Sequence, residues 1–128
     1  MKTLLVVTAL FTAVLLRPAQ ADLIGFYTFD DPANPLADDS GQDNHLAEPG
    51  GEANPTFDEA GGIQGGAFTY DGADRLIAPI NINPEEEPEL TVGAWVRTAS
   101  VEPGLRKIMG HDNGGWDRTV GLDNREGD

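Results

Sequence analysis

Glycine and proline interrupt this chain so often that helices of ordinary length have little room in it. After residue 21 the sequence contains all 16 of its glycines and eight of its 9 prolines, and the longest stretch without either is Ala94–Glu102. An average α-helix takes about 11 to 12 residues, and a proline in its interior removes a backbone hydrogen bond. Short strands separated by turns fit this spacing better, so the sequence predicts an all-β fold.

The first twenty-one residues have the organisation of a signal peptide. Lys2 supplies a positive charge, the stretch Leu4–Leu16 is apolar, and Ala19 and Ala21 are the small residues that signal peptidase requires. This stretch is too short to cross a bilayer, which takes about 20 residues. We therefore expect residues 1–21 to be removed on export, leaving no membrane span. The sequence predicts that the mature chain is extracellular, periplasmic or on the cell surface.

The charge of the mature chain excludes one class of partner. Residues 22–128 keep all 22 acidic residues and six of the 8 basic ones, a formal charge of −16. Such a chain repels phosphate backbones, so nucleic acid is not expected as a partner. The absence of cysteine also excludes disulfides and thiolate metal sites.

Two segments give the clearest strand predictions. Leu90–Arg97 alternates, with Leu90 and Val92 on one face and Trp95 on the other, and we expect Trp95 in the core. Leu23–Phe29 is apolar on both faces, as in a strand covered on both sides. Weaker strand predictions are Ala67–Tyr70, Arg75–Ile82, Lys107–Gly110 and Thr119–Asp123.

Four segments follow one another in an order typical of a known family. They are Gly25–Asp30 (GFYTFD), Asp38–His45 (DDSGQDNH), Gly65–Gly72 (GGAFTYDG) and Leu90–Val96 (LTVGAWV). This succession resembles the laminin-G-like (LamG), or concanavalin A-like, jelly-roll family of secreted bacterial proteins. The resemblance covers Leu23 to about Val120 and implies an antiparallel β-sandwich.

The resemblance also bears on domain organisation. Sandwiches of this kind take about 200 residues as one domain. We therefore expect residues 22–128 to be the N-terminal part of a truncated jelly-roll domain, an incomplete sandwich. The alternative is a smaller β fold that is complete in itself, since domains of this size do fold alone.

No arrangement of reactive residues in the sequence predicts catalysis. The glutamates of Glu85–Glu89 stand among prolines in an expected loop, not as an alternating pair on a strand like that of a retaining glycosidase. Neither Ser40 nor Ser100 lies in a nucleophile elbow, and His45 and His111 are far apart in the sequence. We expect the chain not to be an enzyme.

Two loops rich in aspartate are the candidate calcium sites. Ca²⁺ takes oxygen ligands from carboxylates, amides and backbone carbonyls. Many domains of the family that the chain resembles hold one structural calcium, which favours such a site. The alternative is that these side chains cap turns through their own hydrogen bonds. The residues predicted to bind Ca²⁺ are Asp39, Asp43, Asn44, Asp71 and Asp74.

The segment from His111 to Arg118 is the most ligand-like loop. An exposed Trp116 could stack on a sugar ring while Asp112, Asn113 and Asp117 bond its hydroxyls. The alternative is a hairpin turn whose Trp116 packs back onto the sheet.

Two functions of different classes fit these observations. The first is a non-catalytic secreted or cell-surface recognition module that binds a glycan or a surface protein, with structural calcium. The second is a passive structural domain of a longer surface protein. A third reading, the N-terminal piece of a glycoside hydrolase, would need a carboxylate pair elsewhere.

Overall fold

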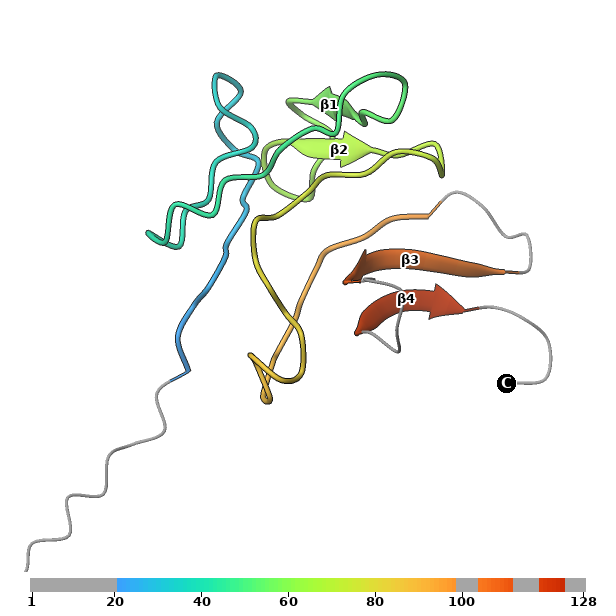
Figure 1. The fold of residues 1–128 in the computed structure, drawn as a ribbon. Coiled ribbons are helices and arrows are strands. Elements are labelled where there is room, and N and C mark those ends of the chain that lie inside the picture. Colours follow the sequence, from blue (N-terminus) through green and yellow to red (C-terminus); the bar gives the residue numbers. More distant parts are fainter. Residues whose placement is uncertain (1–20, 99–103, 112–117, 124–128) are drawn as a thin grey trace, which may run out of the picture.

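Strands are the only regular secondary structure in the part of the chain that the structure describes. The structure is a computed structural model, and it describes residues 21–98, 104–111 and 118–123. These ranges contain two separate two-stranded antiparallel sheets and no helix, which confirms the all-β prediction (Figure 1). The strands are β1 (Thr56–Asp58), β2 (Ala67–Thr69), β3 (Leu105–Gly110) and β4 (Thr119–Asp123). The predicted signal peptide falls almost entirely on residues 1–20, outside the described residues.

The first hairpin carries a small aromatic cluster. Phe57 of β1 lies opposite Phe68 of β2, and their ring centroids are 5.2 Å apart. Phe29 meets Phe68 edge-to-face at the same centroid distance. Contacts of this geometry add about 0.5 to 1.5 kcal/mol beyond burial of area. No aliphatic or aromatic side chain within the described ranges is fully buried, so this half-buried cluster is the nearest thing to a core there.

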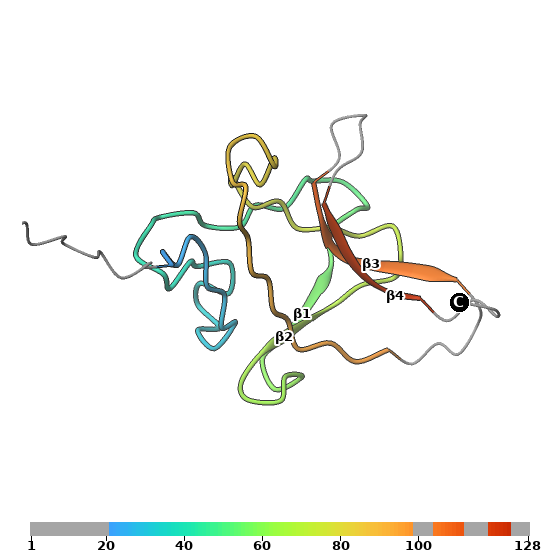
Figure 2. The same cartoon turned by 90° about the horizontal axis from the view of Figure 1, so that it is seen from below.

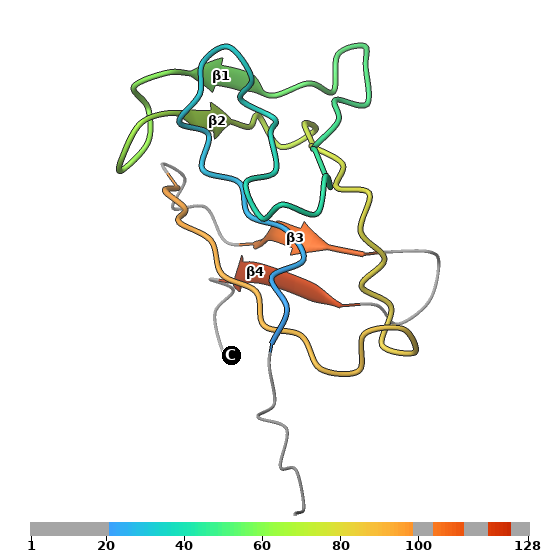
Figure 3. The ribbon, with the colours of Figure 1, turned by 90° about the vertical axis from the view of Figure 1, so that its left-hand side faces the viewer.

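The second hairpin matches the sequence prediction well. The predicted strand Thr119–Asp123 is β4, and the predicted Lys107–Gly110 forms the second part of β3. Met109 pairs with Val120, and the register shifts between Lys107 and Met109, as at a β-bulge. Figure 3 shows this hairpin below β1 and β2, with the N-terminal segment passing in front of it.

The prediction of an interior strand over Leu23–Phe29 is wrong. The segment is extended but belongs to no sheet. The backbone N–H of Phe26 donates to a carboxylate oxygen of Asp38, and the Phe26 carbonyl accepts from the N–H of Asp39 at 2.7 Å. Phe29 then adopts a φ of 60°, which a strand does not allow. Bonds to a neighbouring loop therefore take the place of a strand ladder.

The strand prediction for Leu90–Arg97 is also wrong. Alternation persists locally, because Leu90 and Val92 are half-buried on either side of the exposed Thr91, but the segment pairs with no strand. Trp95 is 86% exposed, so its predicted place in the core is wrong as well. The reason is that no described strand or side chain covers that face of the segment.

The predicted strand Arg75–Ile82 is reduced to one bridge. Ala47 and Ile77 exchange two backbone hydrogen bonds, of 2.8 and 2.9 Å, and no ladder extends from them. Pro79, two residues later, has no N–H with which to continue such a ladder.

The acidic loop after Asn83 projects from the body of the molecule, as expected for a solvated segment (Figure 2). Its turn is closed by the N–H groups of Glu86 and Glu87, which both donate to the Asn83 carbonyl. The described residues contain no helix with the length and apolarity needed to span a membrane.

Candidate functional site

Asp38 is the one buried polar side chain among the described residues, with 7% of its surface exposed. Its Oδ1 accepts the backbone N–H groups of Phe26 and Ser40, both at 2.9 Å. Its Oδ2 accepts the Ser40 hydroxyl at 2.7 Å and the Asn44 N–H at 2.9 Å. An ionised carboxylate offers about four lone-pair sites, and these four donors occupy them.

The hydrogen bonds decide the protonation state of this carboxyl group. Burial alone would raise the pKa of Asp38, because it removes water from the charged form. The bonds from Phe26, Ser40 and Asn44 outweigh that effect and hold the pKa well below its usual range. Asp38 is therefore ionised, and its oxygens are committed to the chain itself.

The loop that presents Asp38 is shaped by local rules of turn formation. Ser40 stands two residues after Asp38 and donates both its backbone N–H and its hydroxyl to the Asp38 carboxylate, as in an Asx turn. Gly41 follows with a φ of 84°, which glycine adopts without a steric penalty. Asp43 has a φ of 58°, a conformation that aspartate tolerates better than most residues.

Further hydrogen bonds fasten the N-terminal segment to the same loop. The Asn44 amide donates to the Ile24 carbonyl, and the Tyr27 hydroxyl donates to the Asn44 carbonyl, each at 2.7 Å. The Asp38 N–H donates to Nδ1 of His45 at 3.0 Å. We call this set of bonds between residues 24–28 and 38–45 the Asp38 clasp.

The Tyr27 hydroxyl is suited to its place in the Asp38 clasp. Burial raises the pKa of Tyr27, and the nearby negative charge of Asp38 raises it further. The phenol therefore keeps its proton over a wide pH range and remains a donor to Asn44.

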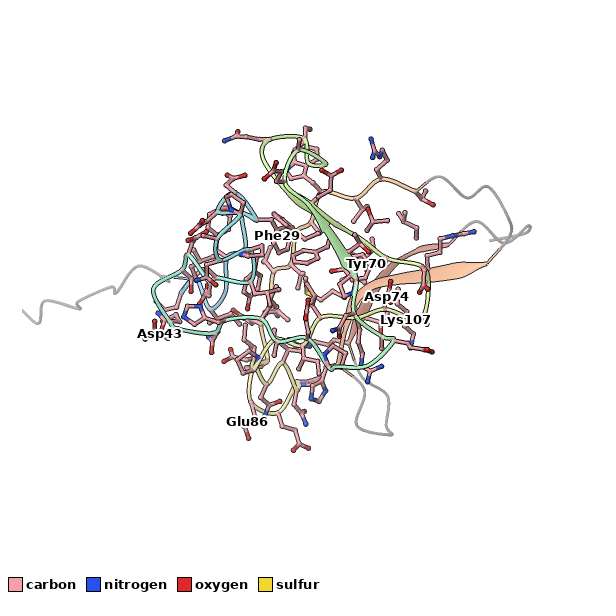
Figure 4. All side chains as sticks on the ribbon, turned by 90° about the horizontal axis from the view of Figure 1, so that it is seen from above. Phe29, Asp43, Tyr70, Asp74, Glu86 and Lys107 are labelled. Carbon is pink, nitrogen blue, oxygen red and sulfur yellow. The ribbon has the colours of Figure 1, made fainter. Side chains whose placement is uncertain are left out.

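The first candidate calcium cluster falls within the Asp38 clasp. Asp39 accepts the Thr28 hydroxyl at 2.7 Å through its Oδ2. Asn44 uses its amide, its N–H and its carbonyl in the bonds above. The exposed Asp43 lies at the edge of the molecule (Figure 4). The structure thus places Asp39, Asp43 and Asn44 in one loop, and Asp39 and Asn44 form hydrogen bonds with other residues of the chain.

The second candidate cluster lies elsewhere. Asp74 accepts the N–H of Asp71 at 2.9 Å, and Asp71 accepts the N–H of Ala73 at the same distance. Figure 4 shows Asp74 far from Asp43, so the two clusters do not form one site. Within residues 21–98, 104–111 and 118–123, no three His, Asp or Glu side chains are placed to share a metal ion. Calcium binding at either loop stays a prediction.

The predicted ligand loop is described only at its base. Asp112, Asn113, Trp116 and Asp117 lie outside the described residues. At the base of the loop the N–H of His111 donates to the Arg118 carbonyl at 3.0 Å. This bond continues the β3–β4 hairpin by one step.

Two features of the described structure were not anticipated as site residues. Asp38 was absent from the predicted sites, although the Asp-x-Ser-Gly pattern that begins with it is a recognisable turn signal. The exposed indole of Trp95 was missed because strand alternation predicts which face a residue occupies and not whether anything covers that face.

Comparison of the chain with protein-family models, with curated proteins and with solved structures finds no match.

Proposed function

We propose that the chain is an exported, non-catalytic recognition module on a laminin-G-like jelly-roll scaffold, and that it binds a glycan or protein ligand. The observation that carries the proposal is the 86% exposure of Trp95. An indole has a large apolar face and an N–H donor, and tryptophan is enriched where proteins bind partners. Structural calcium in the aspartate loops belongs to the same proposal.

The surroundings of Trp95 support a glycan as the first ligand to test. Gly93 and Ala94, which precede it, are small and exposed, so neither carries a large side chain beside the indole. Arg97, two residues after it, is exposed and carries hydrogen-bond donors suited to sugar hydroxyls. An aromatic face with adjacent polar groups is a common arrangement for holding a sugar ring.

The passive structural domain remains the second candidate, and the Asp38 clasp favours it. Both carboxylate oxygens of Asp38 are bonded within the chain, which is what a scaffold element requires.

A glycan array probed with the exported chain tests the proposal. We expect binding to at least one glycan, with at least a tenfold loss, about 1.4 kcal/mol, in Trp95→Ala. The matched control is Ile63→Ala, because Ile63 is also largely exposed, at 78%, and lies between β1 and β2. A folded chain that binds neither glycans nor extracted surface proteins would instead support the passive domain.

A further inference from the structure

Asp71 differs from the other aspartates of the chain in the residue that follows it. Asp71–Gly72 is the only Asp–Gly sequence among the 128 residues. A side chain on the following residue would shield the backbone nitrogen that joins the pair, and glycine has none. Both residues are exposed, and no described atom outside the adjacent residues lies within 4 Å of the place where a Gly72 side chain would begin. The Gly72 nitrogen is therefore open to approach by the Asp71 side chain.

A hydrogen bond holds the Asp71 carboxyl group close to this nitrogen. Its Oδ1 accepts the N–H of Ala73 at 2.9 Å, which closes an Asx turn around Gly72. Because the closed ring contains the Gly72 nitrogen, the carboxyl carbon is held on that side of the backbone. The Asp71 N–H donates to Asp74, which fixes the start of the turn. Figure 4 labels Tyr70 and Asp74, the two residues that flank the turn in the sequence.

Asp39 of the Asp38 clasp provides the comparison. It precedes Ser40, the smallest residue that follows any other aspartate of the chain. Its Oδ2 accepts the Thr28 hydroxyl at 2.7 Å, and its N–H donates to the Phe26 carbonyl at the same distance. The Asp39 carboxyl group is thus bonded to a distant segment, whereas that of Asp71 is bonded across the peptide that follows it.

We propose that Asp71 is a modification site, at which aspartate isomerises to isoaspartate without an enzyme. The Gly72 nitrogen attacks the carbon of the protonated side-chain carboxyl group. A C–N bond forms, a C–O bond breaks, and the carboxyl hydroxyl leaves as water with the N–H proton. The product is a five-membered succinimide ring.

Water then opens the ring by adding to one of its two carbonyl carbons, and the C–N bond to that carbon breaks. Addition at the side-chain carbon restores aspartate. Addition at the backbone carbon of Asp71 leaves the main chain running through the side chain, which is isoaspartate. One water is lost and one is regained, so the mass is unchanged and solvent is the only co-reactant.

The isomerisation alters the turn while it keeps the number of charges. The main chain gains one carbon atom, and the free carboxylate moves onto the Cα atom. The bond from the Ala73 N–H to the Asp71 side chain is therefore lost, together with the position of one predicted Ca²⁺ ligand. Trp95 takes no part in this chemistry, so the inference is independent of the proposed recognition function.

Ageing of the exported chain in warm neutral buffer tests the proposal. Peptide mapping with electron-transfer fragmentation distinguishes isoaspartate from aspartate at each position by its own fragment ions. A synthetic peptide of residues 68–75 gives the rate without a fold. We expect isoaspartate at residue 71 to form in the folded chain no more than about threefold more slowly than in the peptide. We also expect it to form at least about tenfold faster than at residue 39 of the same sample.

Asp71→Glu is the matched variant, because it keeps the carboxylate and lengthens the side chain by one methylene. The corresponding ring would have six members and form far more slowly, so the modification at residue 71 is expected to disappear. Deamidation at Asn113–Gly114, the only Asn–Gly sequence, is told apart because it changes the mass.

Two results on the wild type would overturn the proposal, and neither depends on how a variant folds. A rate at residue 71 more than about threefold below that of the peptide would show that the fold protects Asp71. Rates at residues 71 and 39 that differ by less than about tenfold would show that the glycine and the turn confer no selectivity. A signal that persists in Asp71→Glu would overturn the assignment to Asp71.

Discussion

Asparagine has the same shape as aspartate, so Asp38→Asn changes the hydrogen bonds of the Asp38 clasp and leaves the shape of the side chain unchanged. The asparagine oxygen can still accept two hydrogen bonds, but its amide nitrogen is a donor. In the wild type, Oδ2 of Asp38 accepts the Ser40 hydroxyl and the Asn44 N–H. In Asp38→Asn the amide nitrogen would stand in place of Oδ2 and would face these two donors. The hydroxyl can rotate to accept, but the N–H cannot. We therefore expect Asp38→Asn to lower the stability of the fold.

Ser40→Ala sets the scale for this effect. It removes the 2.7 Å bond from the Ser40 hydroxyl to Asp38 and the weaker 3.2 Å bond from the Gln42 N–H. A hydrogen bond to a charged group contributes about 1.5 to 3 kcal/mol, and the lower figure applies here because Ser40, unlike Asp38, is only half-buried. In a domain of this size 1 kcal/mol moves the Tm by about 4 to 8 °C. We expect Ser40→Ala to lower the Tm by about 6 to 12 °C and Asp38→Asn to lower it further.

Thermal unfolding followed by circular dichroism measures both variants. Asp43→Asn is the matched control, since it makes the same chemical change in the same loop at an exposed side chain. Its positive φ suits asparagine at least as well as aspartate, so its Tm is expected to stay unchanged. If Asp38→Asn melts at the same temperature as Asp43→Asn, the clasp does not hold the fold and the reasoning is refuted.

Four further results follow from the structure. Gly66→Ala is expected to cost about 1 to 3 kcal/mol because a Cβ there would overlap the Phe29 carbonyl and the Phe57 ring, whereas Gly93→Ala, with open space around it, leaves urea unfolding unchanged. Because the pKa of Asp38 is lowered by folding, its contribution to stability is present above about pH 4 and is lost as the pH falls below that, so wild type and Asp38→Asn should converge in acid melting curves. Millimolar Ca²⁺ is expected to raise the Tm if the aspartate loops bind it, while an equal rise with Mg²⁺ would indicate charge screening alone. Trp95→Ala is expected to change the unfolding free energy by less than about 0.5 kcal/mol, and a loss of several kcal/mol would show that the indole is buried.

The hairpins were largely predictable from sequence, because their signals are local. The β3–β4 pair combines short apolar segments with glycine-containing turns, and its strands fall within two residues of the predicted bounds. The predicted Ala67–Tyr70 likewise contains β2. Its partner β1 was missed because three residues are too few to show a period of two.

The two clearest strand predictions failed for one physical reason. Leu23–Phe29 and Leu90–Arg97 have the residue pattern of strands, but a strand also needs a neighbour to accept its backbone hydrogen bonds. In the first segment the Asp38 loop supplies those bonds, through side-chain oxygens that a hydrophobic pattern does not register. In the second, alternation predicted the side on which Leu90 and Val92 lie, since both line one groove. It could not predict that the opposite face, with Trp95, is uncovered.

The candidate site, like the fold, was predictable from the sequence only in part. The Asp-rich loops were found from sequence because aspartate, asparagine and glycine mark turns and oxygen ligands alike. Which oxygens are already used by the chain depends on contacts between segments 12 to 20 residues apart, such as Asp38 with Phe26 and Asn44 with Ile24. The spacing of residues within one motif does not show which of its oxygens are bonded to distant segments of the chain.

Acrylamide quenching of Trp95 fluorescence, in a Trp116→Phe variant that leaves one tryptophan, tests the central claim most directly. The account predicts that the free chain is quenched nearly as fast as tryptophan in solution, because 86% of the side chain is exposed, and that a bound ligand protects it. Slow quenching in the free chain would place Trp95 in a core, as strand alternation alone predicts, and would contradict the proposed recognition surface.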